Sequence, residues 1–96
     1  MEILVTYDVA TETREGRRRL RKVAQVCVDF GQRVQKSVFE CRVNEVQMEK
    51  MRRRLLMLIK EDEDNLRIYR LQQPKEAFIE SYGRKRPINF DEPLIV

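Results

Sequence analysis

The sequence predicts a single α+β domain in which two helices cover one face of an antiparallel sheet. The chain has 96 residues, so it can form one hydrophobic core and no second domain. Apolar residues recur at helical spacing in two segments, and β-favouring residues gather in four others. The apolar share of 42% suffices for a core, but small domains bury a low share of their surface, so dimerisation would help.

The first part of the chain contains a strand followed by a helix. Glu2 to Val9 is an unbroken run of β-favouring residues, as in a strand covered on both faces, and Asp8 lies at its carboxyl end. Residues 11–16 are polar and turn-like, and Gly31 is expected to end the helix that follows. The apolar stripe of that helix comprises Leu20, Val23, Ala24 and Cys27.

Residues 32–43 are expected to form two further strands. Apolar and polar positions alternate in this segment, and the alternation is broken near Ser37. The break indicates two tightly joined strands. No Asn-Gly or Asp-Gly pair marks the turn, so its position stays open.

A second helix and a fourth strand complete the pattern. Asn44 and Gln47 have the spacing of a capping box, which predicts that a helix begins there and ends near Glu61. Its apolar stripe comprises Met48, Met51, Leu55, Leu58 and Ile59. The acidic residues 61–64 then connect it to a β-rich run from Leu66 to Leu71.

The resulting order, β-α-β-β-α-β, predicts a ferredoxin-like sandwich formed by residues 1–71. Residues 72–96 are too apolar to be a free tail, and Phe78 to Tyr82 is a candidate for a short extra strand. We expect this C-terminal segment to dock on an exposed sheet edge, either the chain's own or that of a partner subunit.

The charge of the chain indicates a phosphate-rich partner. There are 20 Lys and Arg residues against 16 Asp and Glu, a formal net charge of +4. Arginine is concentrated in residues 14–21, 52–54 and 84–86, and guanidinium groups suit bidentate phosphate recognition. Nucleic acid is therefore the expected partner.

The absence of histidine excludes histidine general bases, serine or cysteine triads that use histidine, and imidazole-based zinc sites. The two cysteines are expected to be buried small apolar residues rather than a disulfide. The N-terminus has no charged leader with an apolar core, and no apolar run is long enough to span a bilayer. We expect a cytoplasmic protein with no membrane partner.

Asp8 is the most informative carboxylate, and two interpretations of it remain open. It could cap a turn after the first strand. Alternatively, a twofold axis near Asp8 would bring two carboxylates together as an oxygen site for Mg²⁺ or Mn²⁺, where bound water could attack a phosphodiester. The arginine-rich helix start that follows is either a solvated face or a phosphate-binding surface.

Three segments together resemble the CRISPR-associated protein 2 family. They are Thr6-Tyr7-Asp8-Val9, the run from Gly31 to Glu40, and the run from Asp64 to Leu71. The middle run is the most specific, the order and spacing match over residues 1–71, and residues 91–96 are similar to tails seen in part of the family.

The resemblance implies a ferredoxin-like homodimer in which the segment after the fourth strand pairs with the sheet of the other subunit. It implies Asp8 as the carboxylate that binds Mg²⁺ or Mn²⁺, with Tyr7 beside it in the catalytic site and Phe39 as an interface or support residue. Together with the basic helix, it gives the nucleic-acid-binding positions Arg14, Arg17, Arg18, Arg19, Lys22 and Arg33.

Family members are described both as metal-dependent endonucleases on RNA or double-stranded DNA and as non-catalytic bridges between integrase dimers of CRISPR-associated protein 1. The resemblance therefore implies a role in CRISPR spacer acquisition, with duplex DNA, possible RNA substrates and the integrase as partners. The alternative is a toxin-like messenger-RNA interferase or another small ferredoxin-like regulator, which the same fold could support.

Overall fold

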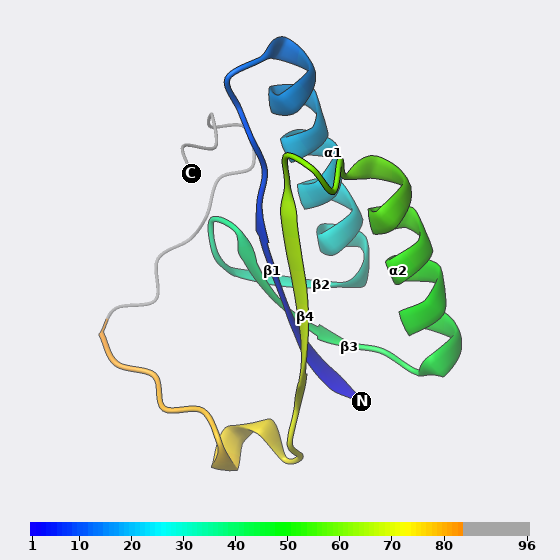
Figure 1. Cartoon of the computed structure of the whole chain (residues 1–96). Coiled ribbons are helices and arrows are strands. Elements are labelled where there is room, and N and C mark those ends of the chain that lie inside the picture. Colours follow the sequence, from blue (N-terminus) through cyan, green and yellow to red (C-terminus); the bar gives the residue numbers. More distant parts are fainter. Residues whose placement is uncertain (84–96) are drawn as a thin grey trace.

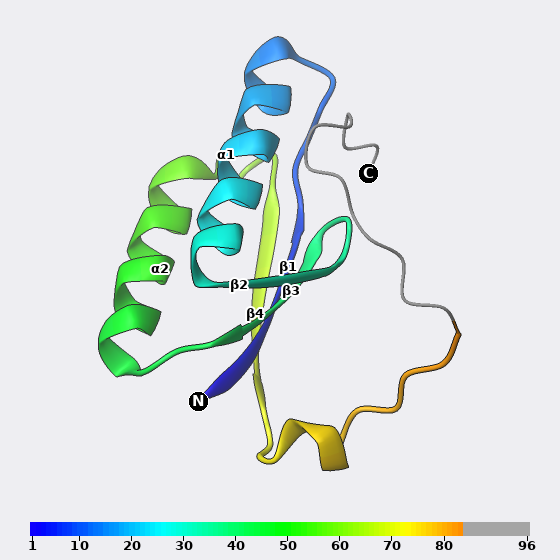
Figure 2. The same ribbon diagram turned by 180° about the vertical axis from the view of Figure 1, so that it is seen from behind.

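The computed structural model describes residues 1–83 and contains a four-stranded antiparallel sheet with two helices packed on one face (Figures 1 and 2). The strands have the spatial order β2-β3-β1-β4. In chain order the elements are β1 (Glu2–Asp8), α1 (Arg14–Phe30), β2 (Gly31–Gln35), β3 (Val38–Arg42), α2 (Glu45–Leu58), β4 (Asn65–Leu71) and the short 3-10 helix η1 (Lys75–Ala77). The ferredoxin-like order expected from the sequence is confirmed.

Two capping interactions set the starts of the helices. The Thr13 side chain accepts a hydrogen bond from the Gly16 amide, so α1 begins at Arg14, within the segment expected to be a turn. Asn44 and Gln47 form the expected capping box in both directions, at 2.8 and 2.9 Å. The helix that they start ends at Leu58, a little before the expected end.

Lys36 and Ser37 form the turn between β2 and β3, which explains the break in the alternation. At the start of β2, Gly31 lies so close to β3 that an added Cβ would collide with the carbonyl of Glu40 and the sulfur of Cys41. Its backbone is extended, with φ of −162°, so close approach rather than unusual conformation demands glycine here.

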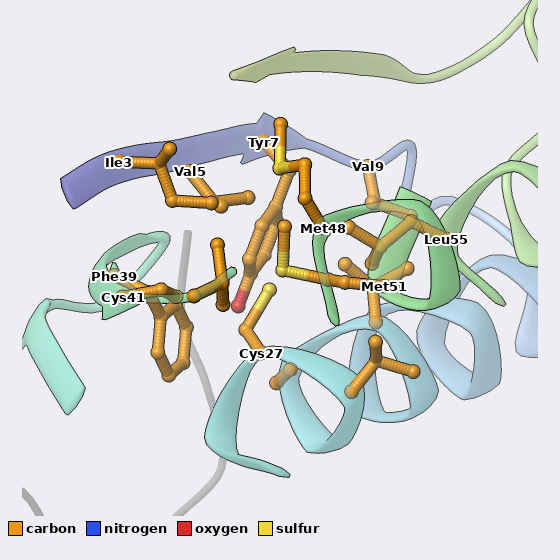
Figure 3. Close-up of a cluster of buried hydrophobic side chains, with 14 of the residues drawn as sticks. Ile3, Val5, Tyr7, Val9, Cys27, Phe39, Cys41, Met48, Met51 and Leu55 are labelled. Atoms are coloured by element: carbon orange, nitrogen blue, oxygen red, sulfur yellow. The ribbon is translucent and has the colours of Figure 1, made fainter. Parts of the chain in front are cut away.

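The core lies between the sheet and the helices, and alternation along β1 decides which residues enter it. Ile3, Val5 and Tyr7 point towards the helices and are almost fully buried, together with Phe39 from β3 and Met51 from α2 (Figure 3). The remaining β1 residues face the other side of the sheet, which no helix covers. We call this side the open face. The second cover expected for this strand is therefore absent over most of its length in residues 1–83.

The chain turns back over the open face after β4. Lys75, in η1, places its Nζ 3.4 Å from Oε2 of Glu40 and 3.9 Å from Oε2 of the buried Glu2. The short strand expected at 78–82 is not present in this single chain, and Phe78 and Tyr82 are 56% and 84% exposed. The rest of the C-terminal segment, including the basic run 84–86 and the tail 91–96, lies outside the described residues.

No helix in residues 1–83 is long and apolar enough to cross a membrane.

Candidate active site at the end of strand β1

Asp8 is the last residue of β1, and its exposed side chain lies on the open face. It stands opposite Asn65, the first residue of β4, in the ladder between the two strands. The next pair on the same face is Thr6 and Arg67. This end of the open face therefore carries the Asp8 carboxylate, the neutral side-chain oxygens of Asn65 and Thr6, and the Arg67 guanidinium.

Asn65 and Arg67 were not identified from the sequence as site residues. The signal was present in the polar alternation Asn65, Arg67, Tyr69 along β4, but only the register with β1 shows that this stripe lies beside Asp8. The Arg67 guanidinium donates a hydrogen bond of 3.3 Å to the Tyr69 hydroxyl, which holds the cation along this face.

The described part of one chain offers no group of three or more His, Cys, Asp or Glu side chains that could hold a metal ion. A single carboxylate is too few ligands for Mg²⁺ or Mn²⁺. The Asp8 carboxylate could bind these ions only together with a second carboxylate from another chain. Asp8 is exposed on the open face, so a second chain can reach it. The expected metal site is thus compatible with a dimer and incomplete in the monomer.

Tyr7 lies on the opposite side of the sheet from Asp8. It is 5% exposed, its ring stacks on Phe39 with centroids 6.2 Å apart, and its hydroxyl donates a long hydrogen bond of 3.4 Å to the Lys36 carbonyl. Burial raises the pKa of Tyr7, although Arg33 and Ser37 act against this. The side chain points into the core (Figure 3), so its geometry suits support of β1 and β3 rather than contact with a substrate on the open face.

Arg33 is also placed inside rather than on the surface. The residue is 8% exposed, pairs with Phe39 across β2 and β3, and holds its guanidinium 5.0 Å from the centre of the Phe39 ring. Phe39 thus lies at the centre of a stack of Tyr7, Phe39 and Arg33, a position compatible with the support role expected for it. To make the expected phosphate contact, the Arg33 side chain would have to move out of this buried position.

The α1 cations predicted to bind nucleic acid divide into an exposed group and one partly buried member. The exposed group, which we call the α1 basic surface, comprises Arg14, Arg17, Arg18 and Lys22. Arg17 donates a hydrogen bond of 3.1 Å to the Thr11 carbonyl in the loop after β1. The helix begins six residues after Asp8, so the α1 basic surface starts at the end of the domain where the carboxylate lies (Figure 1).

Arg19 is the partly buried member, because it forms an ion pair with Asp64. Its Nε lies 2.9 Å from Oδ2 of Asp64 and its second terminal nitrogen lies 3.2 Å from Oδ1. The Arg19 and Asp64 side chains are 12% and 0% exposed. Sequence reasoning assigned Arg19 to nucleic acid and treated Asp64 as part of an acidic connection, and it missed the pair.

The fold and this site define a small ferredoxin-like protein with an exposed strand-end carboxylate beside an arginine-rich helix. The family model described as CRISPR associated protein Cas2 matches residues 1–77. The chain belongs to the Cas2 family.

Two relatives and one solved structure agree with this assignment. The CRISPR-associated endoribonuclease Cas2 1 of Moorella thermoacetica is 62% identical over 96 residues, covering 100% of both chains. The CRISPR-associated endonuclease Cas2 of Halalkalibacterium halodurans is 47% identical over 95 residues, covering 99% of each. The crystal structure of Streptococcus pyogenes Cas2 at pH 6.5 superposes with a TM-score of 0.78 at 49% identity, covering 86% of this chain and 100% of the other.

Proposed function

We propose that this protein is a homodimeric, metal-dependent endonuclease of CRISPR spacer acquisition that also binds duplex DNA and the integrase. The observation that carries the proposal is the place of Asp8, exposed at the end of β1 on the one sheet face that the helices leave open. A twofold pairing of open faces would bring two such carboxylates together. The names of the Moorella and Halalkalibacterium relatives, an endoribonuclease and an endonuclease, support the reaction class.

In this proposal the two Asp8 side chains hold the divalent ion, Mg²⁺ or Mn²⁺, and the α1 basic surface holds the phosphates on either side of the scissile bond. When bound, the ion would stabilise the negative charge of the scissile phosphate and acidify the attacking water. Arg14 and Arg18 orient the strand by contacts that carry no sequence information. Tyr7 and Phe39 keep β1 and β3 in place from the core side.

A cleavage assay tests the catalytic part of the proposal. Wild type, Asp8→Asn and the control Asp62→Asn are incubated with single-stranded RNA or duplex DNA, with Mg²⁺, Mn²⁺ or a chelator. Asp62 is an exposed acid in the turn before β4 and takes no part in the site. Asp8→Asn should lower the rate at least about 100-fold while light scattering still gives a dimer, because a metal ligand is lost without a change in side-chain shape.

Cleavage that survives in Asp8→Asn would overturn the catalytic proposal. Cleavage confined to RNA, in a genome where no integrase gene lies beside the gene for this chain, would favour the interferase alternative instead. Binding of duplex DNA and of the integrase by wild type and Asp8→Asn alike, with no cleavage of any substrate, would reduce the role to a bridge.

A binding assay tests the α1 basic surface. The logarithm of the duplex-binding constant falls with the logarithm of the salt concentration, with a slope of about 0.9 per phosphate contact. Arg14→Gln and Arg18→Gln should each reduce that slope, whereas Arg53→Gln, an exposed arginine on α2, should not. Equal slopes for all four proteins would exclude this surface as the phosphate-binding site.

A further inference from the structure

One buried carboxylate, that of Asp64, connects three segments of the chain around the end of β1. Its Oδ1 accepts a hydrogen bond of 3.0 Å from the amide of Ala10, and its Oδ2 accepts one of 2.9 Å from the amide of Lys60. Both oxygens also accept hydrogen bonds from the Arg19 guanidinium. The side chain is fully buried, so these four hydrogen bonds replace its contacts with water.

Two segments fixed by Asp64, the loop after β1 and the start of β4, are immediate neighbours of Asp8. Ala10 follows Asp8 by two residues and lies in the loop after β1. Asn65 follows Asp64 directly and is the residue opposite Asp8 in the β1–β4 ladder. The backbone of Asp8 is therefore held on two sides by groups that are themselves fixed to one carboxylate.

Asp64 and Lys60 are joined by a second hydrogen bond, between their backbones, which further restricts the carboxylate. The Asp64 amide donates a hydrogen bond of 2.7 Å to the carbonyl of Lys60, the same residue whose amide the carboxylate accepts from. Arg19 comes from the second turn of α1, so the start of the helix is tied to the same point. A carboxylate held by two backbone amides and a two-pronged guanidinium has one orientation.

We propose that Asp64 and Arg19 are positioning residues that set the place of the Asp8 carboxylate for metal binding. This inference rests on the proposed function, because it assumes that Asp8 is a metal ligand. The physical reason is that Mg²⁺ demands near-ideal geometry at about 2.0–2.1 Å. In a twofold site the two subunits carry the same change. A backbone displacement at the end of β1 therefore moves both Asp8 carboxylates relative to the ion.

The inference gives Arg19 a different role from that of its neighbours in α1. A phosphate contact needs an exposed guanidinium, as in Arg18, whereas Arg19 is committed to Asp64 and is also 3.5 Å from Oε2 of Glu63. Substitution of Arg19 should therefore weaken metal binding without changing the number of phosphates contacted. Substitution of Arg18 should do the reverse.

The experiment measures Mn²⁺ binding by electron paramagnetic resonance, together with the salt dependence of duplex binding. The proteins are wild type, Asp64→Asn, Arg19→Gln, the milder Arg19→Lys, and the controls Asp8→Asn, Asp62→Asn and Arg18→Gln. Circular dichroism at the assay temperature confirms the fold of each, and Arg19→Lys provides a folded variant if loss of the buried pair unfolds the others. Lysine keeps the charge but cannot make both hydrogen bonds.

We expect Asp64→Asn and Arg19→Gln to weaken Mn²⁺ binding about 10- to 100-fold, the range found for residues that orient metal ligands, with a smaller effect for Arg19→Lys. Their salt slopes should equal that of wild type, whereas Arg18→Gln should lower the slope and leave Mn²⁺ binding unchanged. Amide hydrogen exchange at Ala10 should become faster in the Asp64 and Arg19 variants, which reports the released loop directly.

Two failures can be told apart. If Asp8→Asn binds Mn²⁺ as wild type does, the proposed function is overturned and the inference falls with it. If Asp8→Asn abolishes Mn²⁺ binding but the folded Asp64 and Arg19 variants bind as wild type, only the inference is overturned. A reduced salt slope in Arg19→Gln or Arg19→Lys with unchanged Mn²⁺ binding would return Arg19 to the phosphate-contacting group.

Discussion

Tyr7 and Asp8 are consecutive in sequence and lie on opposite faces of the sheet. The Tyr7 ring is buried against Phe39 beneath the helices, whereas the Asp8 carboxylate is exposed on the open face. Alternation along β1 causes the separation, since successive side chains of a strand point to opposite sides. The two residues that the family resemblance groups as catalytic should therefore respond differently to substitution.

The first prediction concerns Tyr7. Tyr7→Phe keeps the stacked ring and loses the hydroxyl, whose hydrogen bond to the Lys36 carbonyl is long at 3.4 Å. Its free energy of unfolding should therefore fall by only about 1 kcal/mol, and cleavage should stay within about threefold of wild type. Tyr7→Ala should cost about 3–5 kcal/mol through the cavity it leaves. Urea denaturation and the cleavage assay measure both. Loss of cleavage in a fully stable Tyr7→Phe would instead give the phenol a chemical role.

The second prediction concerns the cysteines. Burial raises the pKa of Cys27 to about 12 and that of Cys41 to about 11, and both thiols are free and almost inaccessible. An aromatic disulfide reagent at pH 8 should label them only as fast as the protein opens, because the thiolate is the reactive form. Labelling should accelerate with urea. An exposed cysteine introduced by Gln25→Cys provides the fast control, and equally fast labelling of wild type would contradict the buried core described here.

The elements of this fold could be predicted because their signals are local. The capping box of Asn44 and Gln47 and the apolar stripe of α1 depend on residues within a few positions of one another, and the structure confirms both. The β2–β3 turn was indicated by the break in alternation, which is local as well. The predicted bounds differ from those observed by a few residues.

The site was only partly predictable because its contacts join distant segments. Asp64 and Ala10 are 54 positions apart, and nothing in the acidic run 61–64 distinguishes the one carboxylate that turns inward. The burial of Arg33 likewise depends on the register that places it opposite Phe39. Charge patterning identified the α1 basic surface correctly as exposed, but it could not separate Arg19 from its neighbours.

The third prediction follows from the ionisation of Asp64. Burial alone would raise the pKa of its carboxyl, but hydrogen bonds from Arg19 and from the Lys60 and Ala10 amides lower it below the usual value. A folded-state pKa below the unfolded value of about 3.9 means that Asp64 stabilises the fold above that pH and loses this contribution as pH falls through its folded pKa.

The difference in unfolding free energy between wild type and Asp64→Asn should accordingly be about 3 kcal/mol or more at pH 7 and shrink in acid. Urea titrations between pH 7 and pH 2.5 measure it. The control is Asp29→Asn, whose exposed carboxyl pairs with Arg54 on the surface and should have a smaller effect. A difference that does not change with pH would contradict an ionised Asp64.

The fourth prediction concerns Gly31. Gly31→Ala places a methyl group against the Glu40 carbonyl and the Cys41 sulfur, so β2 must move away from β3. The expected loss of stability is about 1–3 kcal/mol. Adding Cys41→Ala should not restore stability, because the backbone carbonyl remains in the way. Thermal unfolding of the single and double variants measures the loss of stability, with the exposed Gln32→Ala as control. Full rescue by Cys41→Ala would show that the sulfur alone causes the clash.

The fifth prediction concerns the segment after β4 and the expected exchange between subunits. Lys75 anchors the start of this segment to Glu40 and Glu2 on the open face, whereas Phe78 and Tyr82 beyond it are exposed in the single chain and contribute nothing to its core. Deletion of residues 78–96 should therefore leave the sandwich folded but remove self-association. Light scattering should report a monomer, and the unfolding midpoint should no longer depend on protein concentration.

A matched control separates loss of a specific contact from loss of apolar surface in general. Val46 and Met57 on α2 are 72% and 81% exposed and lie on the helical side of the molecule, away from the open face. The pair Val46→Ser and Met57→Ser should leave the dimer intact, whereas Phe78→Ser with Tyr82→Ser should weaken it. If the truncated chain still dimerises with full affinity, the exchanged segment is not needed for pairing. The subunits would then pair through their open faces alone, and no exchanged strand would cover the sheet edge at β4.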